Sequence, residues 1–264
     1  MRKEEIKFQD SLVFEGMTSI RAVIAAIDTG ISDRRIEYIY YDKDKLGKIS
    51  KEIGYFKAVS DKYAFNLVES DAVELDKMTL GTSHGGIVAK VSARTIPSLT
   101  EAYVSGKIEH TRFYCMIQGI EDPYNFGYAI RSLYACGCKG IILGKRNWMS
   151  AAGVVCRSSA GASELIDVFY ADDNECIDIF KSIGYTVVCA DERTDNLLGE
   201  TALPLPILLL VGGEKRGISR ALISNADILI KIDYARDFRA SLSAASATTM
   251  FAYEIMRQNK KMLS

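Results

Sequence analysis

The sequence contains only two histidines, carries almost no net charge and has no long hydrophobic run. Its 33 basic residues nearly balance its 34 acidic ones, so a nucleic-acid partner would have to be bound by a local basic patch. The longest apolar run is too short to span a bilayer. The charged start, from Met1 to Ile6, lacks the apolar segment of a signal peptide. We therefore expect a cytoplasmic protein without a membrane partner.

The cysteine pattern does not predict a metal site. Cys136 and Cys138 form a close pair, but no second pair follows at zinc-ligand spacing, and the only histidines are His84 and His110. Four of the six cysteines lie in or beside apolar runs, as buried free thiols do. We expect reduced thiols and no bound metal.

The order of the predicted elements favours an α/β protein. Apolar residues make up 48% of the chain and charged residues 25%, the composition of an ordinary globular protein. Both halves alternate strand-like and helix-like segments. In the first half we expect strands at 36–41, 64–68 and 86–91 and helices at 18–28, 45–57 and 71–77. In the second half we expect strands at 113–117, 140–143, 168–170, 185–189, 207–211 and 228–232 and helices at 126–137, 175–183 and 242–259.

A boundary between two domains is expected in the mixed polar stretch 94–108, which contains Pro97 and Gly106. The runs 185–189 and 207–211 are almost continuously apolar, which is typical of strands in a parallel sheet covered on both faces. The expected division is an N-terminal α/β/α domain at 1–96, a linker at 97–111 and a second domain with a parallel sheet at 112–264.

The segment from Asp122 to Gly137 begins as a loop after a buried strand and continues into a helix. In open α/β sheets, ligands bind at such carboxyl ends of strands. Asn125 and Arg131 are therefore candidate site residues. The alternative is that Asn125 only caps the helix and that Arg131 is an ordinary surface residue.

A second segment, from Leu208 to Ser219, runs from a buried strand into Gly212, Gly213 and Glu214. Glycines at the end of a strand let a ligand approach the backbone closely. The spacing fits neither a phosphate-binding P-loop nor a dinucleotide-binding fingerprint. The alternative is a tight turn followed by solvated charges.

In a third segment, Ile232 is followed by Arg236, Arg239 and a run of small residues from Ser241 to Ala247. Small side chains at the start of a helix permit close packing of backbone or ligand. A tightly packed helix start without a ligand explains the same pattern.

Taken together, the three segments resemble the signature motifs of the SpoU (TrmH-type) methyltransferases of the SPOUT superfamily. The first motif, N-x-G-x-x-x-R with a closing Gly, is matched by Asn125, Gly127, Arg131 and Gly137. The second, G-x-E-x-x-G, is matched by Gly212, Glu214 and Gly217. The third, I-P-M-x-G followed by S-L-N, is matched at Ile232, Ser241 and Leu242. The order and spacing of the three motifs are far more specific than any one of them.

The third motif departs from the family pattern. Asp233 to Arg236 replace Pro-Met-x-Gly, the gap is one residue longer, and Ser243 replaces the expected Asn. A serine hydroxyl offers fewer hydrogen-bonding groups than an amide. We therefore expect the change at Ser243 to affect catalytic activity more than cofactor binding.

The first half is similar to the auxiliary domain of large-subunit rRNA methyltransferases, which resembles a small ribosomal-protein RNA-binding fold. The similarity lies in Phe14 to Met17 and in Gly81 to Val91. His84 is a candidate RNA contact, and the alternative is a histidine that only shapes the turn before a strand.

The resemblance implies methyl transfer from S-adenosylmethionine to a ribose 2′-hydroxyl, with rRNA favoured over tRNA as the substrate of this chain. It also implies a deep trefoil knot, a rare exception to unknotted topology, and a homodimer with a shared site. The implied catalytic residues are Asn125, Arg131, Glu214, Ser241 and Ser243. The implied cofactor-binding residues are Gly212, Ile232 and Leu242. A basic rim for RNA would consist of Lys215, Arg216, Arg236 and Arg239.

The chemistry of guanidinium decides between two roles for Arg131. A guanidinium stays protonated in proteins, which argues against proton abstraction by Arg131. A phosphate clamp that also stabilises developing alkoxide charge is the better assignment.

Two other interpretations remain. One is an RNA-binding family member that has lost catalysis through the change at Ser243. The other is a small-molecule α/β enzyme, which the order of the three motifs disfavours.

Overall fold

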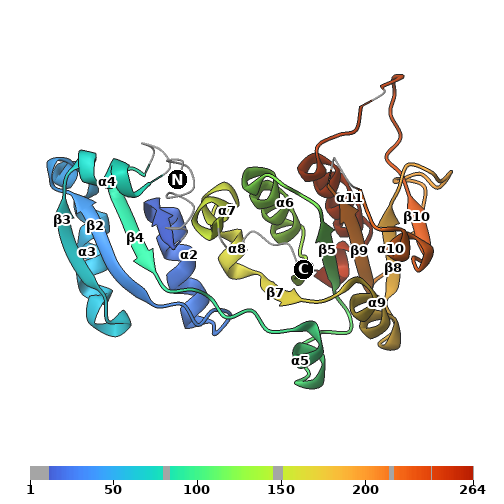
Figure 1. The fold of residues 1–264 in the computed structure, drawn as a ribbon, viewed down its shortest axis with the longest axis horizontal. Helices are drawn as coiled ribbons and strands as arrows, with labels where there is room; N and C mark the ends of the chain where they lie inside the picture. The colour runs from blue at the N-terminus through green and yellow to red at the C-terminus, as the bar shows by residue number, and fades with distance from the viewer. Residues whose placement is uncertain (1–11, 80–83, 145–150, 214–216, 239, 264) are drawn as a thin grey trace, which may run out of the picture. The chain divides into compact units, whose positions relative to one another are not determined.

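The chain forms two compact units in a computed structural model that describes residues 12–79, 84–144, 151–213, 217–238 and 240–263 (Figure 1). The first unit comprises Met1–Thr95 and Trp148–Leu165, and the second comprises Ile96–Asn147 and Ile166–Ser264. Both are α/β, as expected from the alternation of elements. The backbone therefore passes between the units three times.

The first unit is built on a mixed four-stranded sheet in the order β1-β4-β2-β3. Its strands are β1 (Val13–Glu15), β2 (Ile36–Asp42), β3 (Asn66–Ser70) and β4 (Ile87–Val91). β2 and β3 are parallel, whereas β4 is antiparallel to β1 and β2. Its helices include α2 (Gly16–Asp28), η1 (Lys43–Lys45), α3 (Leu46–Tyr63) and α4 (Ala72–Met78). The three expected strands lie within two residues of their predicted positions, whereas β1 was not predicted.

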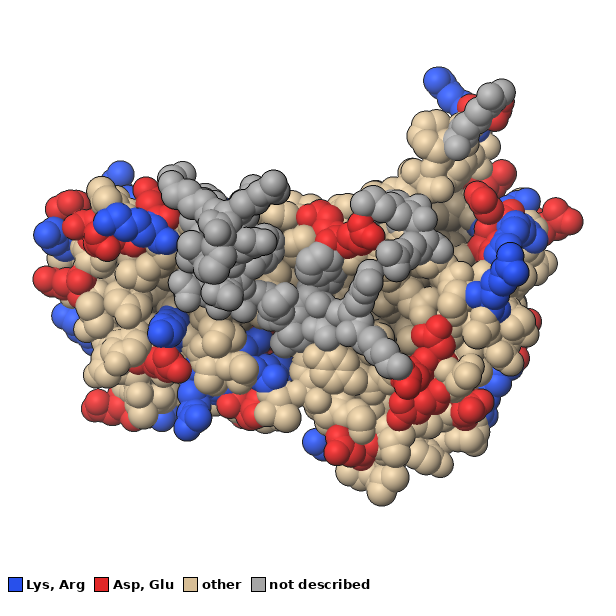
Figure 2. All heavy atoms as spheres, in the orientation of Figure 1, with Lys and Arg blue, Asp and Glu red and all other residues tan. Residues whose placement is uncertain are grey.

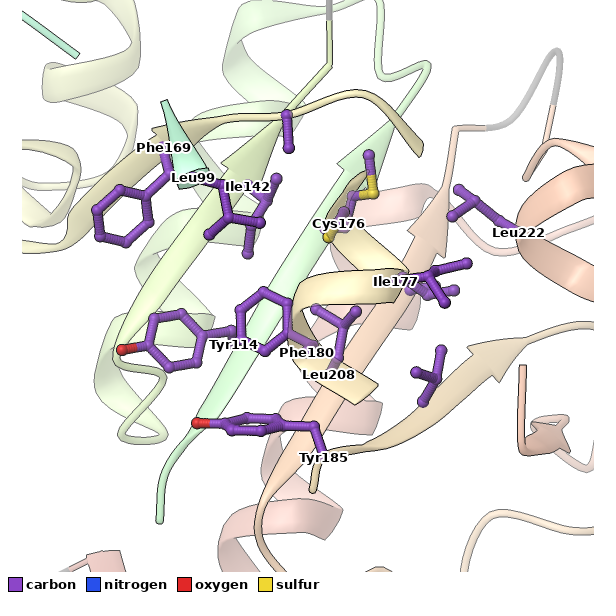
Figure 3. Packing of buried hydrophobic residues seen from close by; sticks show 14 of the residues in the cluster. Leu99, Tyr114, Ile142, Phe169, Cys176, Ile177, Phe180, Tyr185, Leu208 and Leu222 are labelled. Carbon is purple, nitrogen blue, oxygen red and sulfur yellow. The ribbon is translucent and has the colours of Figure 1, made fainter. Parts of the chain in front are cut away.

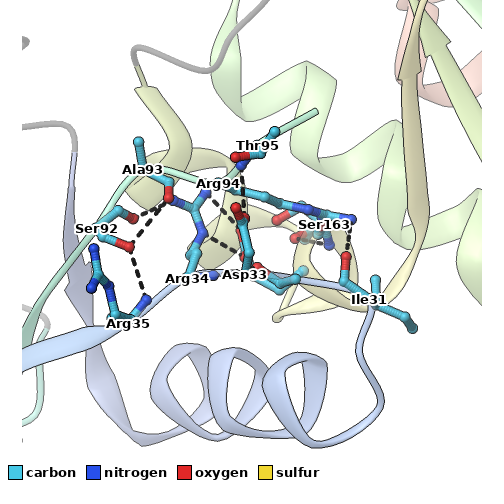
Figure 4. Close-up of polar contacts among 12 residues, drawn as sticks. Ile31, Asp33, Arg34, Arg35, Ser92, Ala93, Arg94, Thr95 and Ser163 are labelled. Carbon is cyan, nitrogen blue, oxygen red and sulfur yellow. Dashed lines mark hydrogen bonds and ion pairs between the residues drawn. The ribbon is translucent and has the colours of Figure 1, made fainter. Parts of the chain in front are cut away.

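Two short helices from the middle of the sequence, α7 (Ala152–Ser158) and α8 (Ala162–Leu165), belong to this first unit. Between them Gly161 has a φ of +90°, and a Cβ there would lie 2.5 Å from the Cβ of Ala22 in α2. The Arg94 guanidinium donates hydrogen bonds to the carbonyl oxygens of Ser163 and Ile31, both at 3.1 Å (Figure 4). The sequence alone did not predict this docking, because the contacts join residues more than 60 positions apart.

The second unit is built on a six-stranded sheet in the order β10-β8-β9-β5-β6-β7. Every neighbouring pair is parallel, as the apolar runs predicted. The strands are β5 (Phe113–Gln118), β6 (Gly140–Leu143), β7 (Asp167–Tyr170), β8 (Thr186–Ala190), β9 (Ile207–Gly212) and β10 (Ile228–Ile230). Residues Phe113 to Met116 and Ile207 to Leu210 are completely buried in the two central strands. Burial on both faces explains why these strands contain no alternating polar residues.

The helices of the second unit are α5 (Leu99–Val104), α6 (Pro123–Ala135), α9 (Asp173–Ser182), α10 (Arg220–Ser224), α11 (Ala244–Gln258) and α12 (Lys260–Leu263). Figure 3 shows one side of the core, where the ring of Tyr114 lies 5.2 Å from that of Phe180 and 6.0 Å from that of Tyr185. None of the helices in the described residues is long and apolar enough to cross a membrane.

Helix α5 lies inside the stretch expected to be a linker. Ser98 and Glu101 form a capping box at its start, which satisfies backbone N–H groups of the first turn. Leu99 and Ala102 are buried in the core of the second unit. The expected linker is therefore partly a packed helix. The polar composition of 94–108 concealed it, because a helix this short needs few apolar residues to pack.

Candidate functional site

The three segments singled out in the sequence follow strands β5, β9 and β10. Because all strands of the second sheet are parallel, the carboxyl ends of these strands lie at one edge. β5 and β9 are direct neighbours, and β10 is separated from β9 by β8. This edge is where ligands bind in open α/β sheets.

Helix α6 places the residues of the first segment. The helix begins at Pro123 rather than near Phe126, because the Asp122 carboxylate accepts a hydrogen bond from the Asn125 backbone N–H at 2.9 Å. Asp122 is thus the N-cap, and Asn125 lies within the first turn. The alternative in which Asn125 caps the helix is wrong.

Arg131 lies on the exposed side of α6, whereas Phe126, Ile130 and Leu133 face the interior. Within the described part of the chain, its guanidinium makes no hydrogen bond and no ion pair. An exposed guanidinium without a protein partner keeps all five of its N–H donors available for a ligand.

Helix α11 packs against α6 and contains the end of the third segment. The Thr249 hydroxyl of α11 donates a hydrogen bond to the Ser132 hydroxyl of α6 at 2.6 Å. Ser243 is the N-cap of α11, and its hydroxyl accepts a hydrogen bond from the Ser246 N–H at 3.1 Å. Since Asn caps helices as well as Ser does, the replacement in the third motif preserves this helix start.

The glycines of the second segment are required by neighbouring backbone. A Cβ on Gly213 would overlap the carbonyl oxygen of Gly119, and one on Gly212 would lie 2.5 Å from the carbonyl carbon of Gly217. Gly217 has a φ of +60°, and its N–H donates a hydrogen bond to the Gly213 carbonyl at 2.9 Å. The close approach expected here is therefore made by the chain itself, so these contacts explain both glycines without a ligand.

A partly buried hydrogen-bond network holds Ser219, the last residue of the second segment. The Gln118 side-chain amide donates to the Asp173 carboxylate at 2.5 Å, and the Ser219 hydroxyl donates to its other oxygen at 2.7 Å. The Ser219 N–H donates in turn to the Gln118 side-chain oxygen at 3.1 Å. The network joins β5, α9 and the start of α10. These residues lie far apart along the chain and match no motif, so the sequence offered no signal for them.

The third segment contains Ile232 and Leu242, both of which are partly buried. Ser241 and Arg236 are exposed. The Leu242 N–H donates a hydrogen bond to the Tyr234 hydroxyl at 3.2 Å. This contact ties the beginning of the segment to its end.

His84 lies in the first unit, and its ring is buried. Its Nδ1 accepts a hydrogen bond from the Gly86 N–H at 3.1 Å, and its Nε2 lies 3.0 Å from an oxygen of Asp76. Both ring nitrogens are thus engaged within the protein. The geometry favours the turn-forming role over the RNA contact.

Four candidate residues, Glu214, Lys215, Arg216 and Arg239, lie outside the described residues. In the described part of the chain, no cluster of three or more His, Cys, Asp or Glu side chains is placed to hold a metal ion. All six cysteines are free and buried. Burial raises the pKa of Cys189 to about 12 and also raises the pKa of Cys136, so these thiols stay protonated at neutral pH.

The sequence pattern of the SpoU rRNA Methylase family matches residues 112–253. The chain belongs to this family. YacO of Bacillus subtilis strain 168, a protein named for the TrmH family, is 26% identical over 89% of this chain and 93% of its own length. The Blochmanniella floridana 23S rRNA (guanosine-2′-O-)-methyltransferase RlmB is 28% identical over 75% of this chain and 79% of its own length.

The fold of the whole chain is also that of solved SpoU proteins. The SpoU methyltransferase AviRb from Streptomyces viridochromogenes, in complex with AdoMet, matches with a TM-score of 0.76 and 20% identity. The match covers 98% of this chain and 99% of AviRb. The six-stranded parallel sheet is thus a SpoU-type sheet, and the mixed four-stranded sheet accompanies it as an N-terminal domain.

Proposed function

We propose that this protein transfers a methyl group from S-adenosylmethionine to a ribose 2′-hydroxyl of rRNA. The observation that carries the proposal is the exposed guanidinium of Arg131, which has no protein partner in the described chain and lies on the helix after β5. RlmB relatives named as 23S rRNA enzymes support rRNA over tRNA. Acting on ribosomal RNA, the protein would work in the cytoplasm.

The residues present fit S-adenosylmethionine. Ile232 and Leu242 offer partly buried apolar side chains after β10, and Gly212 offers backbone at the same edge of the sheet. Apolar surface with backbone polar groups suits an adenosine moiety. When bound, the cofactor would supply an activated methyl group on a sulfonium, whose C–S bond breaks to leave a neutral thioether. The protein then has to align the acceptor hydroxyl and stabilise the charge on its oxygen while the hydroxyl proton passes to water. The proposal includes the deep trefoil knot that the family resemblance implies for the second domain.

Arg131 stabilises the negative charge that develops on the ribose oxygen, and it holds an adjoining phosphate. A guanidinium is always protonated and offers a planar fork that fits phosphate, so it is a clamp rather than a base. Asn125 orients the ribose from the first turn of the same helix. Glu214, Ser241 and Ser243 complete the proposed catalytic set. Lys215, Arg216, Arg236 and Arg239 form the proposed RNA rim.

A second copy of the chain covers the exposed face formed by α6 and α11. Tyr124 and Tyr128 lie on α6 one turn apart and on the same side as Arg131, and Met250 and Tyr253 are exposed on α11. Exposed apolar side chains that gather on packed helices are typical of an oligomer interface. With Arg131 on this face, the interface would border the site.

The dimer is tested by sedimentation. We expect Met250→Asp to convert a dimer into a monomer, whereas Val104→Asp, which changes an exposed residue of α5, leaves the dimer intact. Dimers of the same stability in both variants would refute this interface.

The function is tested with labelled S-adenosylmethionine and total RNA from a strain that lacks the protein. We expect label in rRNA, in 2′-O-methylated nucleotides. Cofactor binding without transfer to any RNA would favour the second candidate, an RNA-binding member with weakened catalysis.

The observation that favours this second candidate is that Ser243 already uses its hydroxyl as the cap of α11. Ser243→Asn distinguishes the two candidates, because a large gain in turnover would indicate that the serine limits catalysis.

A further inference from the structure

The segment between β10 and α11 carries two exposed aromatic rings where the family pattern has Pro-Met-x-Gly and the following gap. Tyr234 is 38% exposed and Phe238 is 55% exposed. Their ring centroids lie 6.0 Å apart in an edge-to-face arrangement. Figure 1 shows this part of the chain extending away from the sheet. Water-exposed rings held together in this way offer an apolar surface that the fold itself does not use.

Hydrogen bonds hold Tyr234 and the beginning of the segment in place. The Tyr234 hydroxyl accepts from the Leu242 N–H at 3.2 Å. The Lys231 N–H donates to the Asn196 carbonyl at 2.9 Å, and the Leu198 N–H donates to the Lys231 carbonyl at 2.8 Å. Tyr234 is therefore preorganised and Phe238 packs against it, which reduces the ordering cost of binding.

The charged residues around the two rings limit which ligands can bind there. Arg236 lies between Tyr234 and Phe238 in the sequence and is exposed, with no hydrogen bond or ion pair to any described residue. Asp233 and Asp237 are exposed in the same segment, so the described charges from Asp233 to Phe238 comprise two acidic groups and one basic group. Figure 2 shows basic and acidic side chains together at the end of this projection. A surface without an excess of basic groups does not bind a phosphate backbone by charge alone, so the rings must supply the affinity.

We propose that Tyr234 and Phe238 form a stacking site for an unpaired nucleobase of the RNA substrate, with Arg236 on the adjoining phosphate. The inference deepens the proposed function and rests on it. Proteins recognise single-stranded RNA by stacking splayed bases on aromatic side chains, whereas paired bases do not expose their faces. The site thus selects a loop or a bulge rather than a helix.

The proposal is tested by measuring the affinity of the full-length protein for a ten-nucleotide oligoadenylate, single-stranded or paired with oligouridylate. We expect Phe238→Ala to weaken binding of the single strand about tenfold and binding of the duplex less than twofold. Phe238→Trp should restore binding, because it restores a ring. The control is Tyr103→Ala, which removes from α5 a ring about as exposed (39%) as that of Tyr234 (38%) and should change neither affinity.

Three results would overturn the proposal. The first is unchanged affinity of Phe238→Ala for the single strand. The second is a loss of S-adenosylmethionine affinity in the same variant, which would assign the rings to the cofactor. The third is a shift from dimer to monomer on sedimentation, which would assign them to a second copy. Two results together would separate this proposal from the proposed function. If the wild-type protein methylates no RNA while Phe238→Ala still weakens binding of the single strand, the proposed function is refuted and the stacking site is retained.

Discussion

Two arginines in different parts of the molecule have opposite surroundings. In the first unit, Arg34 is 2% exposed, and its guanidinium donates two hydrogen bonds to Glu164 of α8, at 2.8 and 3.3 Å, and one to the Ser92 carbonyl at 2.8 Å. It also lies over the ring of Phe14, 5.1 Å from its centroid. In the second unit, Arg131 is exposed and bonds to no described residue.

The difference separates a structural arginine from a candidate functional one. A buried guanidinium must have all its donors satisfied by the fold, or it would not remain buried and charged. An exposed one bears no such requirement and can direct its donors at a ligand. The comparison predicts that changes at Arg34 act on stability and changes at Arg131 act on catalysis.

The largest effect is expected at Arg34. Arg34→Met should lower the free energy of unfolding by about 3–5 kcal/mol, because Glu164 would remain as a buried, unpaired carboxylate. Urea unfolding measures the loss. The control is Arg35→Met at the neighbouring exposed position, which should change stability by less than about 0.5 kcal/mol. Pairing Arg34→Met with Glu164→Gln should recover part of the loss, and no recovery would refute the reason given.

The next largest effect is expected at Arg131. Arg131→Ala should reduce methyl transfer by about 10² to 10³-fold, as the loss of a group that stabilises transition-state charge does. The free energy of unfolding and the affinity for S-adenosylmethionine should stay close to those of the wild type. Arg131→Lys keeps the charge but loses the planar fork, so it should recover only part of the activity. A collapse of cofactor affinity in the alanine variant would show that Arg131 belongs to the cofactor site instead.

A smaller effect, on both stability and catalysis, is expected at Asp173. Asp173→Ala removes the acceptor shared by Gln118 and Ser219 and should cost about 1–3 kcal/mol of unfolding free energy. Because the network holds the described end of the second motif, the KM for S-adenosylmethionine should rise while kcat falls less. Asp178→Ala, on the exposed side of the same helix, is the matched control. An unchanged KM in Asp173→Ala would mean that the network serves stability alone.

The smallest effect is expected at Ser243. Ser243→Ala removes the cap of α11 and should lower the free energy of unfolding by about 1 kcal/mol, whereas Ser243→Asn should keep it. The free energies of unfolding of the two variants are compared by thermal unfolding. Equal losses in both variants would show that the side chain does not act as a cap.

Much of the fold was predictable because local patterns specify it. The strands of the parallel sheet are short, continuous apolar runs, and their positions in the sequence agree with β5 to β10 within two residues. Helix ends were less predictable. α6 starts three residues before its expected position, because Asp122 rather than Asn125 is the cap. Helices α5, α7, α8, α10 and α12 were not predicted. None is longer than seven residues, so each offers at most two turns of amphipathic pattern, and among helices this short only α4 was predicted.

The sequence by itself determined the α/β class, the parallel sheet and the order of three motifs that identify the SpoU family. These properties depend on composition, periodicity and spacing, all of which are local. Only the tertiary structure decided that His84 is engaged within its own unit, that Gly213 is required by the backbone of Gly119, and that Gln118, Asp173 and Ser219 form one network. Each of these depends on which distant residues the fold brings within a few ångströms, and that information is spread over the whole chain.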